Sequence, residues 1–380
     1  MRGNKTVFLP EELIIQILLR LPVKSLLRFK CVSRSWLSLI TDPHFTKSHF
    51  ELAAARTHRL VFLDTSSLIT RSIDFNASLH DDCARSIDLN AFLHDDCASV
   101  ALNDNFIITD TCFNVQILGS CRGFVLLDCR GSLWVWNPST CAHKQVSYSP
   151  VDMGVSFYTF LYGFGYDPLT DDYLVVQVSN NPNSDDFVNR VEFFSLRANA
   201  WKEIEGVHLS YMNCCDDIRR GTFLNGVIHW LTFRHDVLMG VIVAFDIMER
   251  SFSEIPLPLD FDSDFNFCEL AVLGESLSLH VFGAEIWVMQ EYKVQSSWTK
   301  TIGVSIDDIP NRYFSLICST KSGDIIGTDG SAGLAKCNNE GQLLEYRSYF
   351  NGSSGYQQVT LYSESLLSLP CDSEQAEEDE

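Results

Sequence analysis

The chain has 380 residues, of which 46% are hydrophobic and 20% are charged, so it is long enough for about two ordered domains. Its formal net charge is −21, which argues against nucleic acid and anionic membranes as binding partners. No apolar run approaches the ~18 residues that a transmembrane helix requires, and no apolar signal segment follows Arg2 and Lys5.

Thirteen cysteines occur without any Cys-x-x-Cys pair, and several lie within apolar runs. This pattern indicates reduced, mostly buried thiols, as in cytoplasmic or nuclear proteins, rather than disulfides or a zinc site. The sequence also lacks a glycine-rich phosphate loop, an HExxH motif and a nucleophile elbow, and its histidines are scattered. We therefore expect no cofactor, no metal ion and no catalytic residues.

The N-terminal region is expected to be helical. Pro10 suits the first turn of a helix, and the two glutamates after it favour the positive end of that helix, which Pro22 then ends. The apolar residues expected along one side are Leu13, Ile14, Ile17, Leu18 and Leu21. Further short helices are predicted over residues 24–30, 33–41 and 43–55. Helices this short bury too little apolar surface to be stable alone, which indicates a binding partner.

The order and spacing of these residues resemble the F-box, the helical module by which receptor subunits of SCF-type ubiquitin ligases bind the adaptor Skp. The matching residues are Leu9-Pro10, Leu13, Ile17-Leu18, the run from Leu21 to Leu26, Cys31-Val32-Ser33 and Trp36. The resemblance implies that Skp is bound by Leu9, Pro10, Leu13, Ile17, Leu18, Leu21, Pro22, Leu26, Val32 and Trp36. The alternative is a helical hairpin that packs only on the rest of the chain.

An internal duplication occupies residues 71–98, where RSIDFNASLHDDCA is followed at once by RSIDLNAFLHDDCA. Each copy contains His-Asp-Asp-Cys, from His80 to Cys83 and from His94 to Cys97. Catalytic partners normally meet through the fold rather than along four consecutive residues. A segment that tolerates copying is typical of a surface loop, so we predict a loop here.

Beyond residue 112 the chain consists of short alternating or apolar strands separated by turn signals. Five groups of three or four strands are predicted, at residues 114–148, 157–207, 221–258, 268–304 and 313–350. Arg122-Gly123 and Asn225-Gly226 are predicted turns, the second a strong hairpin signal. A repeat of about 45 residues indicates the blades of a β-propeller.

A sixth blade can be assembled from the two ends of this region. Residues 358–369 would pair with residues 57–64, which would close the ring and leave no open sheet edge. We therefore predict a mainly β fold, in which an N-terminal three-helix module precedes a β-propeller-like domain of about six blades. A pair of β-sandwiches is the alternative.

Recurring motifs mark most of the strand groups. They are Gly119-Ser120-Cys121-Arg122-Gly123, Trp136-Asn137-Pro138-Ser139-Thr140, Tyr162-Gly163-Phe164-Gly165-Tyr166-Asp167 with Asp172-Tyr173, Asn225-Gly226 with His229-Trp230, Ala244-Phe245-Asp246, Ile286-Trp287-Val288-Met289 with Glu291-Tyr292 and Ser297-Trp298, and Tyr362 with Glu364-Ser365-Leu366. As a set they resemble the F-box-associated interaction domain of plant F-box proteins, often labelled F-box/kelch-repeat and including the S-locus F-box proteins of pollen. Kelch blades begin with a Gly-Gly pair, which this chain lacks, so the kelch label is loose.

The resemblance implies an F-box module at residues 1–55 and a substrate-binding domain at residues 56–370, before an acidic tail, expected to be disordered, at residues 371–380. It implies a non-catalytic substrate receptor that docks on Skp, and through Skp on cullin, and presents a target protein for ubiquitination and proteasomal degradation. A non-degradative Skp-bound scaffold and a propeller enzyme are the alternatives.

Charge favours a basic target protein. Residues 1–55 contain eight basic and four acidic residues and so have a net charge of about +4. The rest of the chain therefore has a net charge of about −25, against −21 for the whole chain. The resemblance includes pollen receptors of basic ribonucleases, and complementary charge speeds the association of partners. Acidic pairs such as Asp185-Asp186 and Asp216-Asp217 are expected to contribute, although the sequence does not identify the residues that bind the target.

Overall fold

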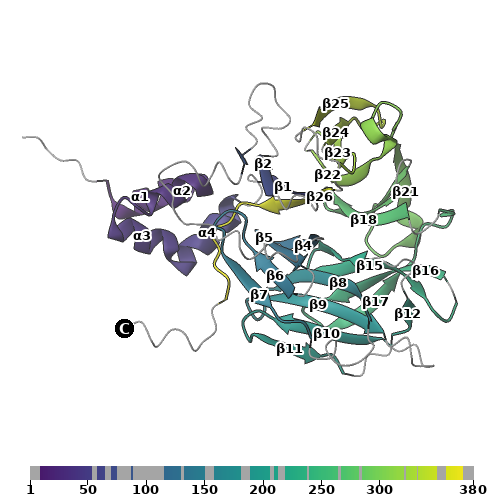
Figure 1. The fold of residues 1–380 in the computed structure, drawn as a ribbon, viewed down its shortest axis with the longest axis horizontal. Coiled ribbons are helices and arrows are strands. Elements are labelled where there is room, and N and C mark those ends of the chain that lie inside the picture. The colour runs from purple at the N-terminus through teal and green to yellow at the C-terminus, as the bar shows by residue number, and fades with distance from the viewer. Residues whose placement is uncertain are drawn as a thin grey trace, which may run out of the picture.

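The computed structural model describes residues 9–53, 58–64, 70–74, 87–88, 115–129, 132–149, 158–180, 189–205, 209–212, 219–237, 239–263, 267–281, 285–320, 322–331, 333–348 and 357–370. In this part of the chain, four helices precede six β-sheets of four or five strands each (Figure 1). None of the helices described is long and apolar enough to cross a membrane.

The four helices are short and closely spaced. They are α1 (Glu11–Leu18), α2 (Val23–Phe29), α3 (Arg34–Thr41) and α4 (Pro43–Ala53). Pro10 and Pro22 directly precede α1 and α2, and the hydroxyl of Ser33 caps α3 by accepting a 3.2 Å hydrogen bond from the Trp36 N–H. The first helix was predicted to continue to Pro22, which is wrong, since α1 ends at Leu18 and Pro22 is the N-cap of α2.

The six sheets follow one another along the chain, and the first also contains the last strand. They are β26-β1-β2-β3 (Gln357–Ser363, His58–Asp64, Thr70–Asp74, Ile87–Asp88); β4 to β7 (Val115–Cys121, Phe124–Cys129, Ser132–Trp136, His143–Val146); β8 to β11 (Tyr158–Asp167, Asp172–Asn180, Arg190–Ser195, Ala200–Glu203) with β13 (Arg219–Arg220); β14 to β17 (Thr222–Leu224, Val227–Arg234, Met239–Asp246, Ser251–Ile255) with β12 (Tyr211–Met212); β18 to β21 (Cys268–Leu273, Ser276–Val281, Glu285–Met289, Trp298–Gly303); and β22 to β25 (Ser315–Ser319, Ile325–Thr328, Gly333–Cys337, Leu343–Ser348). Single 3₁₀ turns lie at Gln295–Ser297 and Pro310–Arg312.

The sheets form a closed ring. The inner strands β26, β4, β8, β14, β18 and β22 contact one another in this order, and β22 contacts β26 again. In the closing sheet, β26 pairs with β1 in antiparallel register from His58 opposite Ser363 to Asp64 opposite Gln357. Strands from the two ends of the domain thus share one sheet. This confirms the predicted β-propeller of about six blades and the way in which its ring closes.

Two predicted turns have the backbone that a two-residue hairpin loop requires. Arg122 and Gly123 have φ values of 47° and 86°, and Asn225 and Gly226 have φ values of 50° and 83°. Two successive residues with positive φ characterise the type I′ turn, whose twist matches that of the flanking strands. Both turn predictions are confirmed.

The two-residue strand β13, which was not predicted, lies at the junction of two neighbouring sheets. β13 pairs in parallel with β8, and β14, directly after it, pairs antiparallel with β15. A Cβ atom on the intervening Gly221 would lie 2.4 Å from Cγ2 of Ile228, so the close approach requires glycine. Trp230 fills the junction and donates a 2.8 Å hydrogen bond from its indole N–H to the carbonyl of Tyr162.

The duplication is wrongly predicted as a loop at the residues that the structure describes. β2 belongs to the first copy and β3 to the second, and they pair with each other through Ser72 opposite Ile87. Ser72 is buried, and its hydroxyl lies 2.9 Å from Nε of Arg59 and 2.8 Å from the hydroxyl of Tyr362. These hydrogen bonds hold Ser72, a residue of the first copy, within the closing sheet. Both His-Asp-Asp-Cys segments lie outside the described residues, as do Asp185-Asp186, Asp216-Asp217 and residues 371–380.

Candidate functional site

Helix α1 presents apolar side chains on two adjacent faces. Leu13 and Ile17 are 50% and 51% exposed, whereas Leu18 is 1% exposed and Ile14 is partly buried against the same cluster. An α-helix turns by about 100° per residue, so residues 13 and 17 share one side and residues 14 and 18 the next. The predicted apolar side is therefore broad: its inner part packs on the other helices, and its outer part remains uncovered by the described residues.

The exposed apolar residues of the helical module define a candidate docking face. Of the ten predicted adaptor-binding residues, six are exposed: Leu9, Pro10, Leu13, Ile17, Pro22 and Val32. Leu9 and Val32 expose 55% and 62% of their surface. Large apolar side chains exposed together in so small a module are typical of a protein-binding site.

The other four predicted residues lie inward. Leu18 and Leu26 are buried in a cluster with Val23, Ile40 and Phe45, while Leu21 and Trp36 are half-buried against it. Trp36 packs edge-on against Phe29, with ring centroids 5.3 Å apart. These four side chains pack the helices together, and the half-buried Leu21 and Trp36 also keep part of their surface exposed.

The surroundings of the docking face are basic. Arg20, Lys24, Arg28, Lys30 and Arg34 lie on or between the first three helices, where Glu11 and Glu12 are the only acidic residues. Burial lowers the pKa of Lys30 below its ordinary value of 10.5. The charge favours a partner whose contact surface is acidic.

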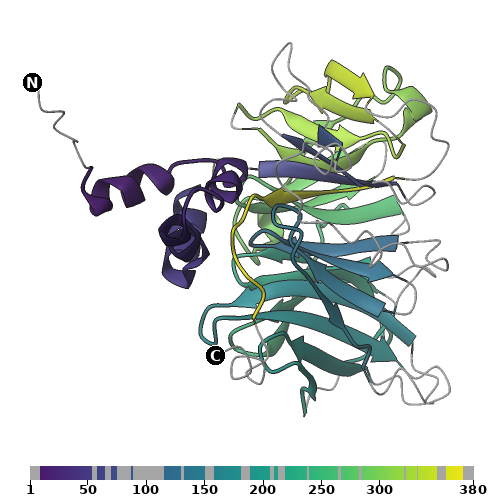
Figure 2. The ribbon, with the colours of Figure 1, turned by 60° about the vertical axis from the view of Figure 1, so that its left-hand side comes forward.

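The helices lie on one face of the propeller, and the opposite face points away from them (Figure 2). At this junction the guanidinium carbon of Arg122, in the β4–β5 turn, lies 4.9 Å from the ring centroid of Phe50 in α4. The same guanidinium lies 4.2 Å from the ring centroid of Tyr166. Arg122 of the β4–β7 sheet thus contacts both the helical module and β8 of the neighbouring sheet through cation–π interactions.

Residues 364–370, here called the C-terminal segment, run from β26 along the face of the propeller that carries the helices (Figure 2). Leu366 is 3% exposed and belongs to the apolar cluster of the helices. The prediction that the last strand continues to residue 369 is wrong. The amide of Asn137 donates to the carbonyls of Ser365 and Leu367, at 3.1 and 3.2 Å, so these carbonyls bind the β6–β7 turn instead of a neighbouring strand.

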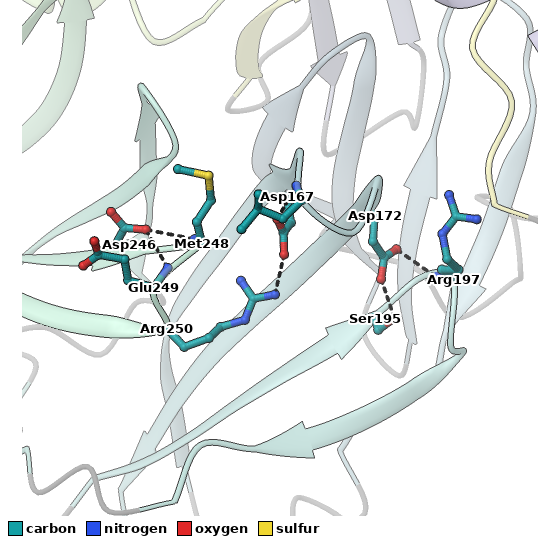
Figure 3. A network of polar contacts seen from close by, with 9 residues as sticks. Asp167, Asp172, Ser195, Arg197, Asp246, Met248, Glu249 and Arg250 are labelled. Atoms are coloured by element: carbon teal, nitrogen blue, oxygen red, sulfur yellow. Dashed lines mark hydrogen bonds and ion pairs between the residues drawn. The ribbon is translucent and has the colours of Figure 1, made fainter. Parts of the chain in front are cut away.

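Three aspartates order turns of the propeller (Figure 3). Asp172 accepts hydrogen bonds from the Ser195 hydroxyl and the Arg197 N–H, and Asp246 accepts from two backbone N–H groups of its own turn. Asp167 accepts from the Leu169 N–H at 2.9 Å and from the Arg250 guanidinium at 2.7 Å. These hydrogen bonds indicate that the three carboxylates stabilise turns.

Two buried histidines and two buried cysteines of the propeller are uncharged near neutral pH. Burial lowers the pKa of His229 and of His280 to about 4 each, and it raises the pKa of the Cys121 and Cys318 thiols to about 12. Thiols of such high pKa carry too little thiolate to act as nucleophiles. In the described part of the chain, no cluster of three His, Cys, Asp or Glu residues could hold a metal ion.

A cavity of about 460 Å³ lies between the inner strands β4, β14, β18, β22 and β26. Its charged groups bind one another, since Arg220 pairs with Glu269 at 3.2 Å and the Ser315 hydroxyl donates to Glu269 at 3.1 Å. Burial opposes the ionisation of Glu269, but Arg220, His280 and Ser315 together hold its pKa below the usual 4.5. The apolar remainder of the lining includes Leu270 and Leu316.

Sequence reasoning missed the roles of Arg122 and Leu366 at the junction. Both residues stand inside recognised motifs, Gly-Ser-Cys-Arg-Gly and Glu-Ser-Leu, so a signal was present in the pattern. Nothing local shows that their partners are Phe50 and the helix interior, because those contacts join residues far apart in sequence.

Comparison with protein families agrees with this architecture. The model of the F-box domain matches residues 8–48, and that of the F-box associated beta propeller domain matches residues 85–337, which is more than half of the chain. The chain is 28% identical to the F-box/kelch-repeat protein At3g23880 of Arabidopsis thaliana, over 78% of this chain and 79% of that protein. It is also 28% identical to the F-box protein CPR1 of Arabidopsis thaliana, over 78% of this chain and 73% of that protein. Helices with an exposed apolar face, joined to a closed ring of sheets, thus place the chain in the family of F-box proteins with an F-box associated β-propeller domain.

Proposed function

We propose that this protein is the substrate receptor of an SCF-type ubiquitin ligase. Its helices bind a Skp adaptor and, through it, cullin, while the propeller binds a target protein for ubiquitination and proteasomal degradation. The observation that carries the proposal is the exposure of Leu9, Leu13 and Ile17 on a module that matches the F-box domain. Burying these side chains against an adaptor would stabilise the complex by removing apolar surface from water.

The placement of the helices suits a receptor. They occupy one face of the propeller, so a target bound on the opposite face would not compete with the adaptor (Figure 2). The receptor then acts by holding the target near the ubiquitin-carrying subunits, which converts a bimolecular transfer into one at high local concentration. This role needs no catalytic group in the receptor itself.

The charge of the chain supports a basic target protein. The net charge is −21, and the first 55 residues are net positive, so the acidic excess lies in the propeller and tail. Opposite charge raises association rates and rejects wrong partners. Association with the captured target should therefore slow markedly as salt rises from about 50 to about 300 mM. A rate that is independent of salt would contradict the charge argument and leave the receptor role intact.

Co-purification with the Skp adaptor tests the docking face. Leu13→Asp combined with Ile17→Asp places two carboxylates in the contact, and burying a charge costs several kcal/mol, so adaptor binding should fall more than about a hundredfold. Leu169→Asp combined with Leu344→Asp is the matched control, because these propeller leucines are 75% and 54% exposed. Leu18 is left unchanged, since a charge there would disrupt the helix interior.

Equal adaptor recovery from wild-type protein and the Leu13/Ile17 variant would refute docking through this face.

Target capture then separates a degradative receptor from a scaffold. Proteins bound to the wild type should accumulate when the proteasome is inhibited, and they should accumulate without inhibition on the Leu13/Ile17 variant, which cannot deliver them. Capture that is unaffected by the inhibitor would favour the scaffold.

A further inference from the structure

The interior of the helical module is completed by a residue from the other end of the described chain. Leu366 is 3% exposed and packs in one cluster with Leu18, Leu19, Val23, Leu26, Ile40 and Phe45. The helices have 7 to 11 residues each, and a module of this size buries little apolar surface of its own. Leu366 is thus one of the seven buried side chains that pack the interior behind the docking face.

The C-terminal segment that carries Leu366 is fixed to the propeller on both sides of this residue. The Ser365 N–H donates to the hydroxyl of Ser139 at 3.2 Å, and the Asn137 amide donates to the Ser365 and Leu367 carbonyls. Leu367 and Leu369 pack against the apolar cluster of sheets β4–β7 and β8–β11. A Cβ atom on Gly123 would lie 2.3 Å from Cβ of Ser365, so the β4–β5 turn also touches the segment closely.

The position of this segment depends on closure of the propeller. It follows directly on β26, the inner strand of the closing sheet, which pairs with β1 over seven residues. The turns that hold it, β4–β5 and β6–β7, belong to the neighbouring sheet. Leu366 can therefore reach the helices in this way only when β26 has paired with β1, which joins the two ends of the propeller, and when the neighbouring sheet is formed.

We propose that adaptor binding by the helices requires the C-terminal segment, so that only a chain with a closed propeller enters the ligase. The inference rests on the proposed function, because it concerns the adaptor-binding site of a receptor. Without Leu366 the helices populate their binding-competent arrangement less often. The apparent Kd for the adaptor rises in inverse proportion to that competent fraction. Incomplete or unfolded receptors, which could not hold a target, are thereby kept from occupying the adaptor.

The first experiment measures the Kd of full-length variants for purified Skp adaptor by calorimetry. L366D puts a charge into the helix interior and should raise Kd at least about tenfold, and L366A should raise it by a smaller factor. L344D is the matched control, because Leu344 is exposed on β25, and deletion of residues 371–380 controls for loss of the chain end. Both controls should stay within about twofold of the wild type.

Two further measurements keep the proposal testable if L366D folds poorly. S139A removes the acceptor of the Ser365 N–H without touching the helices or the docking face, and it should raise Kd severalfold. Hydrogen exchange of the α1–α3 amides reports on the helices without any adaptor, and it should quicken about tenfold in L366A while propeller amides stay protected.

The outcomes separate the inference from the proposed function. If the wild type binds no adaptor, the proposed function fails, and helix exchange alone decides whether the segment holds the module together. If the wild type binds but L366A, L366D and S139A all bind within about twofold of it, the requirement for the C-terminal segment is overturned while the receptor role stands.

Discussion

The guanidinium carbon of Arg122 lies 4.9 Å from the ring centroid of Phe50, so the first hairpin of the β4–β7 sheet contacts the last helix. Tyr166 lies on the same guanidinium at 4.2 Å. Phe50 is 7% exposed, which means that this contact is largely shielded from water. Together with Leu366, it sets how the helices sit on the propeller.

Replacing Arg122 by alanine should lower the free energy of unfolding by about 1–2 kcal/mol, because two partly desolvated cation–π contacts are lost. Urea denaturation measures the change. Arg197→Ala is the control: its ion pair with Asp171 leaves both side chains more than half exposed, so the expected loss is below about 1 kcal/mol. Equal losses in the two variants would show that the Arg122 contacts contribute nothing special.

Replacing Asp167 by alanine should lower the free energy of unfolding by about 3 kcal/mol, because Arg250 would lose the buried partner to which it donates (Figure 3). Burial opposes ionisation of Asp167, but hydrogen bonds from Leu169, Thr170 and Arg250 hold its pKa below 3.8. The matched control is Asp307→Ala, since Asp307 and its partner Arg312 are 81% and 76% exposed. Chemical denaturation of both variants provides the comparison, and a loss no larger than that of the control would contradict the prediction.

Acid should destabilise the propeller between about pH 6.5 and pH 4. Burial lowers the pKa of His229 and His280 to about 4, against an ordinary 6.5, so in this window the unfolded chain binds protons that the folded chain refuses. The contribution of these two histidines to the free energy of unfolding is fully present above about pH 6.5. It falls as pH drops, by about 1 kcal/mol per pH unit for each histidine. Urea denaturation at pH 7.5 and pH 5.5 measures this slope.

His229→Gln should make that slope shallower, whatever its effect at pH 7.5, because one of the two titrating groups is gone. His44→Gln, which replaces an exposed histidine of α4, is the control. An identical slope in wild type and His229→Gln would show that this histidine takes up its proton equally in both states.

Deleting residues 85–98 should change the free energy of unfolding by about 1 kcal/mol or less. The deletion removes β3, which pairs over only two residues at the edge of the closing sheet, and a change in the chain length between paired segments costs little entropy. The remaining copy retains Ser72 and its bonds to Arg59 and Tyr362. Thermal denaturation is the measurement. A loss of several kcal/mol would mean that the second copy is an essential part of the blade.

Features that depend on neighbouring residues could be predicted from the sequence alone. Asn225-Gly226 and Arg122-Gly123 form the expected turns, because positive φ at two successive positions is a local demand. The blades could be predicted from the period of strands and turns, and ring closure from apolar strand residues left over at both ends. The exposure of Leu13 and Ile17 fits the resemblance to the F-box, which rests on local spacing as well.

Contacts between distant segments were decided only in the tertiary structure. The sequence does not distinguish Leu13 from Leu18, since both are apolar residues of one helix, and only the packing of α2, α3 and Leu366 buries the second. The sequence of the duplication is typical of a loop, and only the hydrogen bonds of Ser72 to Arg59 and Tyr362 place its residues in a sheet. The sequence likewise predicts that the last strand continues through Leu366, whereas the structure places this residue in the apolar cluster of the helices. Burial and hydrogen bonding depend on which surfaces meet, and the chain brings these surfaces together only once the ring of sheets has closed.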